Sequence, residues 1–206
     1  MNRIIILTIG IVLAIVASLI GLVVVPEQQL ESFEPVTVTT AGGTEETYPR
    51  PLDDWRERPG KRVYESLGCI YCHSQQVRPD DFGADLLRGW GRRRSVPRDY
   101  LFDDPPLLGS MRTGPDLANA AQRQPSAQWH YLHLYDPQLT SPGSIMPSFK
   151  FLFEVVDRRP RSDTDAVQLP DGSAEGERWI IPTDRARELV GYLLSLDQKF
   201  ALEDVR

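Results

Sequence analysis

Both cysteines of this chain lie in one short segment, Cys69-Ile70-Tyr71-Cys72-His73. Such a pair could form a disulfide, a redox-active dithiol, half of a metal site or a haem attachment point. A thioredoxin-type dithiol requires a βαβ context, which the surrounding sequence does not predict, and a zinc site requires a further thiolate or several histidines. The histidine directly after the second cysteine therefore favours one covalently bound haem c. We predict thioether bonds at Cys69 and Cys72 and an iron ligand at His73.

The second axial ligand of such an iron has few candidates. Apart from the first residue, they are Met111, Met146, His130 and His133. Met146 precedes Pro147, whose ring restricts the backbone behind the sulfur, so we predict Met146 as the ligand. A thioether ligand raises the haem reduction potential relative to a second imidazole. We expect Met111 to be a packing or surface residue, and the two histidines to have structural roles near the haem edge.

Residues around a Gly-Pro-Asp-Leu segment at positions 114–117 are predicted to complete the haem site. In c-type cytochromes a proline carbonyl after a glycine turn commonly accepts a hydrogen bond from the proximal histidine, which fixes the ring orientation. Pro115 is the candidate for that role. Arg112 and Arg78 are candidates for pairing with haem propionates, because a guanidinium group matches a carboxylate in a bidentate manner. A surface role is the alternative for each arginine.

The block from Ile4 to Val25 contains no charged residue. As a helix it would be roughly 33 Å long, enough to cross a bilayer core of roughly 30 Å. Signal-peptide cores are shorter, roughly 7–15 residues, and no small-x-small cleavage site follows, so we predict an uncleaved anchor over residues 1–25. The alternatives are a cleaved signal and a lipid-modified start. Arg3 before the block and acidic residues after it place the N-terminus in the cytoplasm.

The sequence predicts three further regions: a tether at residues 26–58, a haem domain at residues 59–200 and a tail at residues 201–206. The tether carries eight acidic residues against three arginines and several prolines, a composition that buries too little apolar surface to fold alone. Residues 59–200 carry nineteen acidic against eighteen basic residues. This near neutrality argues against a nucleic-acid partner.

Helical patterns bracket the haem domain. One predicted helix begins after Pro59 and ends at Gly68. Another begins at a Thr183 cap and runs through Asp197, and a shorter one spans Ser126–Tyr135. We therefore expect an all-α fold: a single N-terminal transmembrane helix plus a class I-like cytochrome c domain with a long insertion between His73 and Gly114. Its terminal helices are predicted to cross near Gly60 and Tyr64, because a glycine permits close approach.

Two polar segments have no assigned chemistry. Residues 157–176 contain Pro-Asp-Gly and Arg-Arg-Pro sequences and are predicted to form a solvent loop. Arg92, Arg93 and Arg94 form the one concentrated basic run. Such a run is usually a solvated face, and docking to an acidic partner or to anionic lipid headgroups is the alternative.

The sequence from about Gly60 to Leu152, with the C-terminal helix, resembles the monohaem subunit (subunit II) of cbb-type haem–copper cytochrome c oxidases. The resemblance rests on motifs beyond the haem attachment segment, several of which a generic cytochrome c does not require. They are Gly68-Cys69 through Cys72-His73-Ser74-Gln75, Arg78-Pro79, Gly109-Ser110, Arg112-Thr113-Gly114-Pro115-Asp116-Leu117, Trp129-His130, His133-Leu134, Asp136-Pro137 and Ser144-Ile145-Met146-Pro147-Ser148. The chain departs from the family at Met111, where a lysine is usual.

The resemblance implies axial ligation by His73 and Met146 and a single-pass protein of the bacterial inner membrane with its haem domain on the periplasmic side. It also implies a polytopic haem–copper catalytic subunit and other cytochrome c subunits as partners, with oxygen reduction in that catalytic subunit. The alternatives are a stand-alone tethered electron carrier and a haem subunit of another respiratory complex, such as a nitric oxide reductase. A haem-based sensor or peroxidase would need an open sixth position, which a firm Met146 ligand argues against.

Overall fold

The computed structural model describes residues 2–40, 42–160, 163–170 and 178–202. The chain divides into two compact units. The first comprises the residues up to Arg50 together with Val96–Asp103, and the second comprises Pro51–Ser95 together with the residues from Asp104 onward. The boundaries that the sequence predicts for the tether and the haem domain stay predictions.

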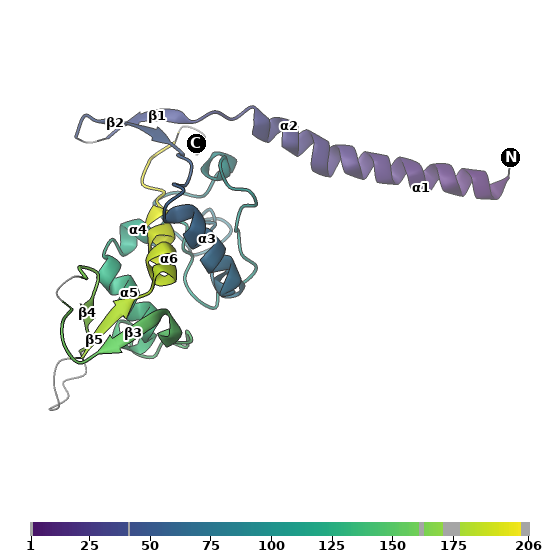
Figure 1. The fold of residues 1–206 in the computed structure, drawn as a ribbon. Coiled ribbons are helices and arrows are strands. Elements are labelled where there is room, and N and C mark those ends of the chain that lie inside the picture. The colour runs from purple at the N-terminus through teal and green to yellow at the C-terminus, as the bar shows by residue number, and fades with distance from the viewer. Residues whose placement is uncertain (1, 41, 161–162, 171–177, 203–206) are drawn as a thin grey trace. The chain divides into compact units, whose positions relative to one another are not determined.

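The first unit begins with an apolar helix. The elements α1 (Arg3–Leu19), η1 (Ile20–Val24, a π-helical turn) and α2 (Val25–Glu31) follow one another without a break, and Figure 1 shows them as one long rod. Together they form a helix of 29 residues that buries none of its most apolar stretch within the protein. Its length and composition make it a candidate membrane span, and it continues past Val25, where the sequence places the end of the anchor.

The rest of the first unit contains more structure than the predicted tether. Strands β1 (Val36–Thr39) and β2 (Glu45–Tyr48) pair antiparallel, with Val36 opposite Tyr48. The sequence shows why: alternating valine and threonine residues favour a strand, and Gly43 adopts φ +78° in the turn. Part of the predicted tether therefore forms a hairpin, and the Tyr48 hydroxyl on β2 donates to Asp99 at 2.8 Å, outside the tether.

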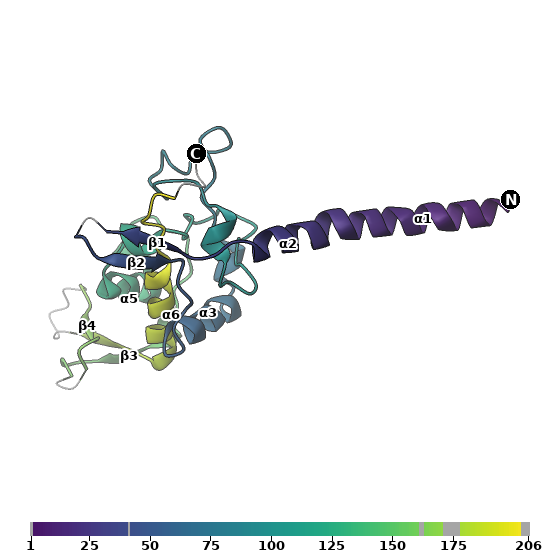
Figure 2. The same ribbon diagram turned by 90° about the horizontal axis from the view of Figure 1, so that it is seen from above.

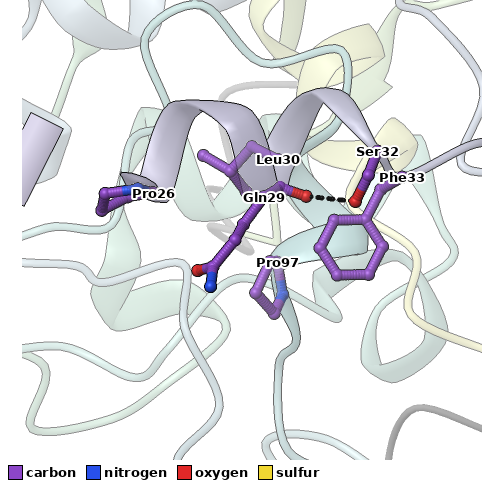
Figure 3. A pocket seen from close by; sticks show the side chains of 6 residues that line it. All are labelled: Pro26, Gln29, Leu30, Ser32, Phe33 and Pro97. Atoms are coloured by element: carbon purple, nitrogen blue, oxygen red, sulfur yellow. Dashed lines mark hydrogen bonds between the residues drawn. The ribbon is translucent and has the colours of Figure 1, made fainter. Parts of the chain in front are cut away.

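A pocket of about 400 Å³ also lies within the first unit. It is lined by Pro26, Gln29, Leu30, Ser32, Phe33 and Pro97, and Figure 3 shows the last turn of α2 forming one wall, with the Ser32 hydroxyl bonded to the Gln29 carbonyl at 2.7 Å. None of these residues is predicted to bind haem.

Helices α3 (Glu57–Ser66) and α6 (Asp184–Ser195) cross in the second unit and lie side by side in both ribbon views (Figures 1 and 2). A Cβ atom on Gly60 would lie 2.0 Å from the carbonyl oxygen of Glu188, so only glycine allows this approach. The Tyr64 and Tyr192 rings pack edge to face, 5.5 Å apart. The predicted crossing near Gly60 and Tyr64 is confirmed.

The other predicted helices are also present. Helix α5 (Ala127–Tyr135) is capped by Ser126, whose hydroxyl accepts a bond from Trp129 N–H at 3.3 Å. Thr183 caps α6 in the same way through Ala186 N–H. A short helix, α4 (Ala120–Arg123), precedes α5. The remaining helical turns are of the 3-10 type: η2 (Cys69–Tyr71), η3 (Pro97–Tyr100), η4 (Pro137–Leu139) and η5 (Lys150–Leu152).

The expectation of an all-α fold holds only in part. Besides the hairpin, the second unit contains an antiparallel sheet in the order β3-β5-β4, formed by β3 (Phe153–Val156), β4 (Val167–Gln168) and β5 (Trp179–Pro182). Strand β4 lies in the predicted solvent loop at 157–176, of which residues 161–162 and 171–176 lie outside the described residues. The protein therefore has more helix than strand, with the β1-β2 hairpin in the first unit and the β3-β5-β4 sheet in the second.

Candidate haem site

The two thiols lie directly after α3. Gly68 adopts φ +73°, which ends the helix and turns the chain into the 3-10 turn η2 (Cys69–Tyr71). The N–H of His73 then donates to the carbonyl of Cys69 at 3.0 Å, which folds the imidazole back toward the attachment segment. Both cysteines are free thiols. Burial raises the pKa of the Cys69 thiol to about 11, whereas Cys72 is exposed.

The His73 imidazole is held by a single strong bond to the main chain. Its Nδ1 lies 2.7 Å from the carbonyl oxygen of Pro115. Because a carbonyl can only accept, Nδ1 carries the proton and Nε2 is left with a free lone pair. The pKa of His73 is lowered, mainly because the ring is buried. The bond to Pro115 opposes this effect, and the charge of Arg123, which lowers the pKa, is opposed by that of Asp116, which raises it. The neutral ring with an open Nε2 is the form that binds iron.

Glycines leave room for this ring. A Cβ atom on Gly114 would lie 2.3 Å from Cε1 of His73, and one on Gly109 would lie 2.5 Å from the His73 carbonyl oxygen. Gly114 N–H also donates to the Cys72 carbonyl at 2.9 Å. Any side chain at Gly114 would push the imidazole away from Pro115. The sequence singles out Gly109 as part of a family motif and Gly114 also as the turn before Pro115, and the structure adds a steric reason for both.

A buried network of charges lies beside Pro115. Asp116 and Asp85 are both fully buried. Arg112 reaches both carboxylates, at 3.0 Å for Asp85 and 3.7 Å for Asp116, and Arg78 binds Asp85 through Nε at 3.2 Å and Nη2 at 3.0 Å. Arg112 and Arg78 are thus already paired with protein carboxylates. Their pairing with haem propionates stays a prediction.

Two guanidinium groups in this region each have an N–H donor without a hydrogen-bond partner among the described residues. The Nε atoms of Arg112 and Arg123 are buried and have no hydrogen-bond partner among the described residues. Arg123 donates through Nη2 to the Asp116 carbonyl, and burial lowers its pKa. Unpaired buried donors fit a bound group that brings acceptor oxygens, as haem does through its propionates. Sequence reasoning did not identify Arg123, Asp85 or the Asp116 carboxylate.

The histidines of α5 have partners of their own. His130 Nε2 donates to the Gln124 carbonyl at 2.9 Å. His133 Nδ1 lies 2.6 Å from the Thr140 hydroxyl, and its ring stacks on Trp129 with centroids 4.6 Å apart. Burial, followed by the charges of His130 and His73, lowers the pKa of His133 to about 4. These contacts support the structural role predicted for both residues.

Met146 lies in a loop organised by a glutamine. Gln138 donates through Nε2 to the Ser144 carbonyl at 2.6 Å, and its Oε1 accepts from Gly143 N–H at 2.9 Å. The Met146 N–H donates to the Ser144 hydroxyl at 3.2 Å, and the Met146 side chain packs against the hydrophobic core. Met111, by contrast, is 58% exposed, as expected of a surface residue.

Comparison with known proteins gives one family. Residues 2–168 match the family model described as "Cytochrome C oxidase, mono-heme subunit/FixO". The match includes the apolar N-terminal helix, the attachment segment, the Gly-Pro-Asp-Leu segment and the Met146 loop. A search of the curated proteins gives no match. With more than half of its length covered, the chain belongs to the FixO family of mono-haem cytochrome c oxidase subunits.

Proposed function

We propose that this chain is the membrane-anchored haem c subunit that passes single electrons to the catalytic subunit of a cbb-type terminal oxidase. The observation that carries the proposal is the arrangement at His73: Cys69 and Cys72 directly precede an imidazole whose Nδ1–H is bonded to the Pro115 carbonyl. Membership of the FixO family supplies the oxidase context. In this proposal the second unit is a class I-like cytochrome c domain, and oxygen is reduced by another subunit.

The chain's own residues would hold the haem at several points. Cys69 and Cys72 would form the thioether bonds, His73 Nε2 and the Met146 sulfur would bind iron, and Arg112 would pair with a propionate. Bound haem c supplies a one-electron ferric/ferrous couple. The bond from His73 to Pro115 keeps the ring in one tautomer and orientation, so that little rearrangement accompanies electron transfer.

The N-terminal helix would place this couple at the membrane. We propose that the helix Arg3–Glu31 is a single-pass anchor in the bacterial inner membrane, with the haem domain on the periplasmic side. Arg3 as the only positive residue before the span supports this orientation. The partners would be lipid, the polytopic haem–copper subunit and other cytochrome c subunits.

Purification of the tagged chain from its native membranes in mild detergent tests the oxidase assignment. We expect a polytopic subunit, haem b and copper to co-purify with the haem c of this chain. A lone mono-haem protein, obtained under conditions that keep a control respiratory complex intact, would overturn the assignment in favour of a stand-alone carrier.

Two pairs of variants test the haem site itself. Replacing Cys69 and Cys72 with alanine should leave no haem on the denatured chain, and covalent haem on that variant would contradict the attachment. Met146→Ala should remove the six-coordinate low-spin spectrum of the oxidised protein, whereas the matched variant Met111→Ala should retain it. An unchanged spectrum in Met146→Ala would show that another group is the second ligand.

A further inference from the structure

We propose that Asp116 is the positioning residue for the iron-binding imidazole of His73 and that its carboxylate contributes to setting the haem reduction potential. This inference rests on the proposed function, because it concerns iron bound at His73. Nothing in the sequence reasoning assigned a role to this carboxylate. It is fully buried, and it follows directly after the residue whose carbonyl holds the imidazole.

Two chain segments meet at His73, and main-chain bonds join them at the residues directly before and after it. Gly114 N–H donates to the Cys72 carbonyl at 2.9 Å, and Leu117 N–H donates to the Ser74 carbonyl at 2.7 Å. The bond between His73 and Pro115 lies between these two in sequence. The orientation of the imidazole therefore depends on how firmly the two segments are held together.

The Asp116 side chain joins the same two segments a second time. Its Oδ2 accepts from the Ser74 hydroxyl at 2.5 Å and from Gln76 N–H at 2.8 Å, while its Oδ1 accepts from Ala118 N–H at 2.9 Å. One carboxylate thus binds the segment after His73 and the segment after Pro115 at once. An asparagine cannot replace it fully, because its NH₂ group would face an N–H donor on one side or the other.

Asp116 acts on the His73 ring through its negative charge as well as through the hydrogen bonds that it accepts. The carboxylate is fully buried, one residue after Pro115, whose carbonyl oxygen lies 2.7 Å from His73 Nδ1. Negative charge beside the ligand stabilises ferric over ferrous haem, so removing it should raise the reduction potential. A looser bond to Pro115 acts in the same direction, because the imidazole then donates less electron density to iron.

Asp85 provides a matched control. It is also fully buried and also pairs with Arg112, at 3.0 Å. The other contacts of its carboxylate, within the part of the chain that the structure describes, are with the side chain and the N–H of Arg78 and not with residues 72–76 or Pro115. Asp85→Asn and Asp116→Asn therefore each remove one buried carboxylate, and only Asp116 is bonded to the segment after His73.

The experiment uses the full-length haem-loaded chain in detergent. Redox titration should give a higher midpoint for Asp116→Asn, by up to a tenfold change in the equilibrium with a fixed redox partner, or about 59 mV for one electron. The g values of the oxidised protein in electron paramagnetic resonance should also shift, because they report the imidazole orientation. Asp85→Asn should lower the free energy of unfolding while changing the midpoint and the g values much less.

Unchanged midpoint and g values in Asp116→Asn, with only stability altered, would overturn the inference, as would an equal shift in Asp85→Asn. If Asp116→Asn does not accumulate with haem, Ser74→Ala removes the 2.5 Å bond alone and should shift the g values; normal g values in that variant would count against the inference. Absence of covalent haem from the unaltered chain would instead contradict the proposed function, which keeps the two failures distinct.

Discussion

The segment around His73 and the loop around Met146 differ in how they are held. His73 lies among buried groups: its ring is bonded to Pro115, and Asp116 joins the two segments beside it. The Met146 loop is held mainly by neutral bonds from one exposed glutamine, Gln138, and the residue before the methionine, Ile145, is 80% exposed. The difference indicates that the histidine side is preorganised, and we predict that the loop of the proposed ligand Met146 opens first.

Of the variants considered, Gly114→Ala should have the largest effect, because it disrupts the packing around the His73 ring. The added Cβ would lie 2.3 Å from the His73 ring, and overpacking of this kind typically costs about 1–3 kcal/mol. We expect loss of most of the low-spin haem and a lower free energy of unfolding, measured by absorbance and denaturant titration.

Gly143→Ala is the matched control on the methionine side. No atom lies within 4 Å of its added Cβ, although the glycine has φ +84°. Only the conformational penalty of about 1–2 kcal/mol applies, and the haem spectrum should be retained. If Gly114→Ala kept the native spectrum and stability, the tight packing of His73 would be disproved.

Gln138→Ala should loosen the methionine side by an intermediate amount. It removes two hydrogen bonds within the loop, each contributing about 0.5–1.5 kcal/mol. We expect cyanide to bind the oxidised haem several-fold faster, because displacement of the Met146 sulfur requires the loop to move. Gln122→Ala, at an exposed position of α4, should bind cyanide at the wild-type rate. An unchanged rate in Gln138→Ala would mean that the loop does not control access.

The features that could be predicted from the sequence are those that a local signal or the chemistry of one residue determines. Local signals sufficed for the helices: Ser126 and Thr183 cap α5 and α6, and Gly60 permits the crossing. Chemistry and spacing likewise brought His73 and Pro115 together, although they are 42 residues apart. In each case the residue type alone indicates the structural role, whether a helix cap, a close helix crossing or the histidine–proline hydrogen bond.

The missed features depend on partners that are distant in sequence. Strand β3 is four residues long and is stabilised by pairing with β5, which is distant in sequence. Neither strand can therefore be predicted from its local sequence alone. Asp116 reads as an ordinary turn residue until folding places Ser74 and Gln76 against its carboxylate. The guanidinium of Arg112 can bind a propionate, as the sequence predicts. Only the fold shows that it already forms an ion pair with the Asp85 carboxylate at 3.0 Å.

Ile145→Ser should have the smallest effect and sharpens the comparison most directly. An exposed side chain away from structural features usually changes the free energy of unfolding by no more than about 0.5 kcal/mol when it is replaced. We therefore expect wild-type stability and a wild-type cyanide-binding rate in the isolated haem-loaded chain, measured as for Gln138→Ala. A loss above about 1 kcal/mol would mean that the residue packs against the bound haem. The methionine side would then be closed by apolar contact, and the bonds of Gln138 would not be what holds it.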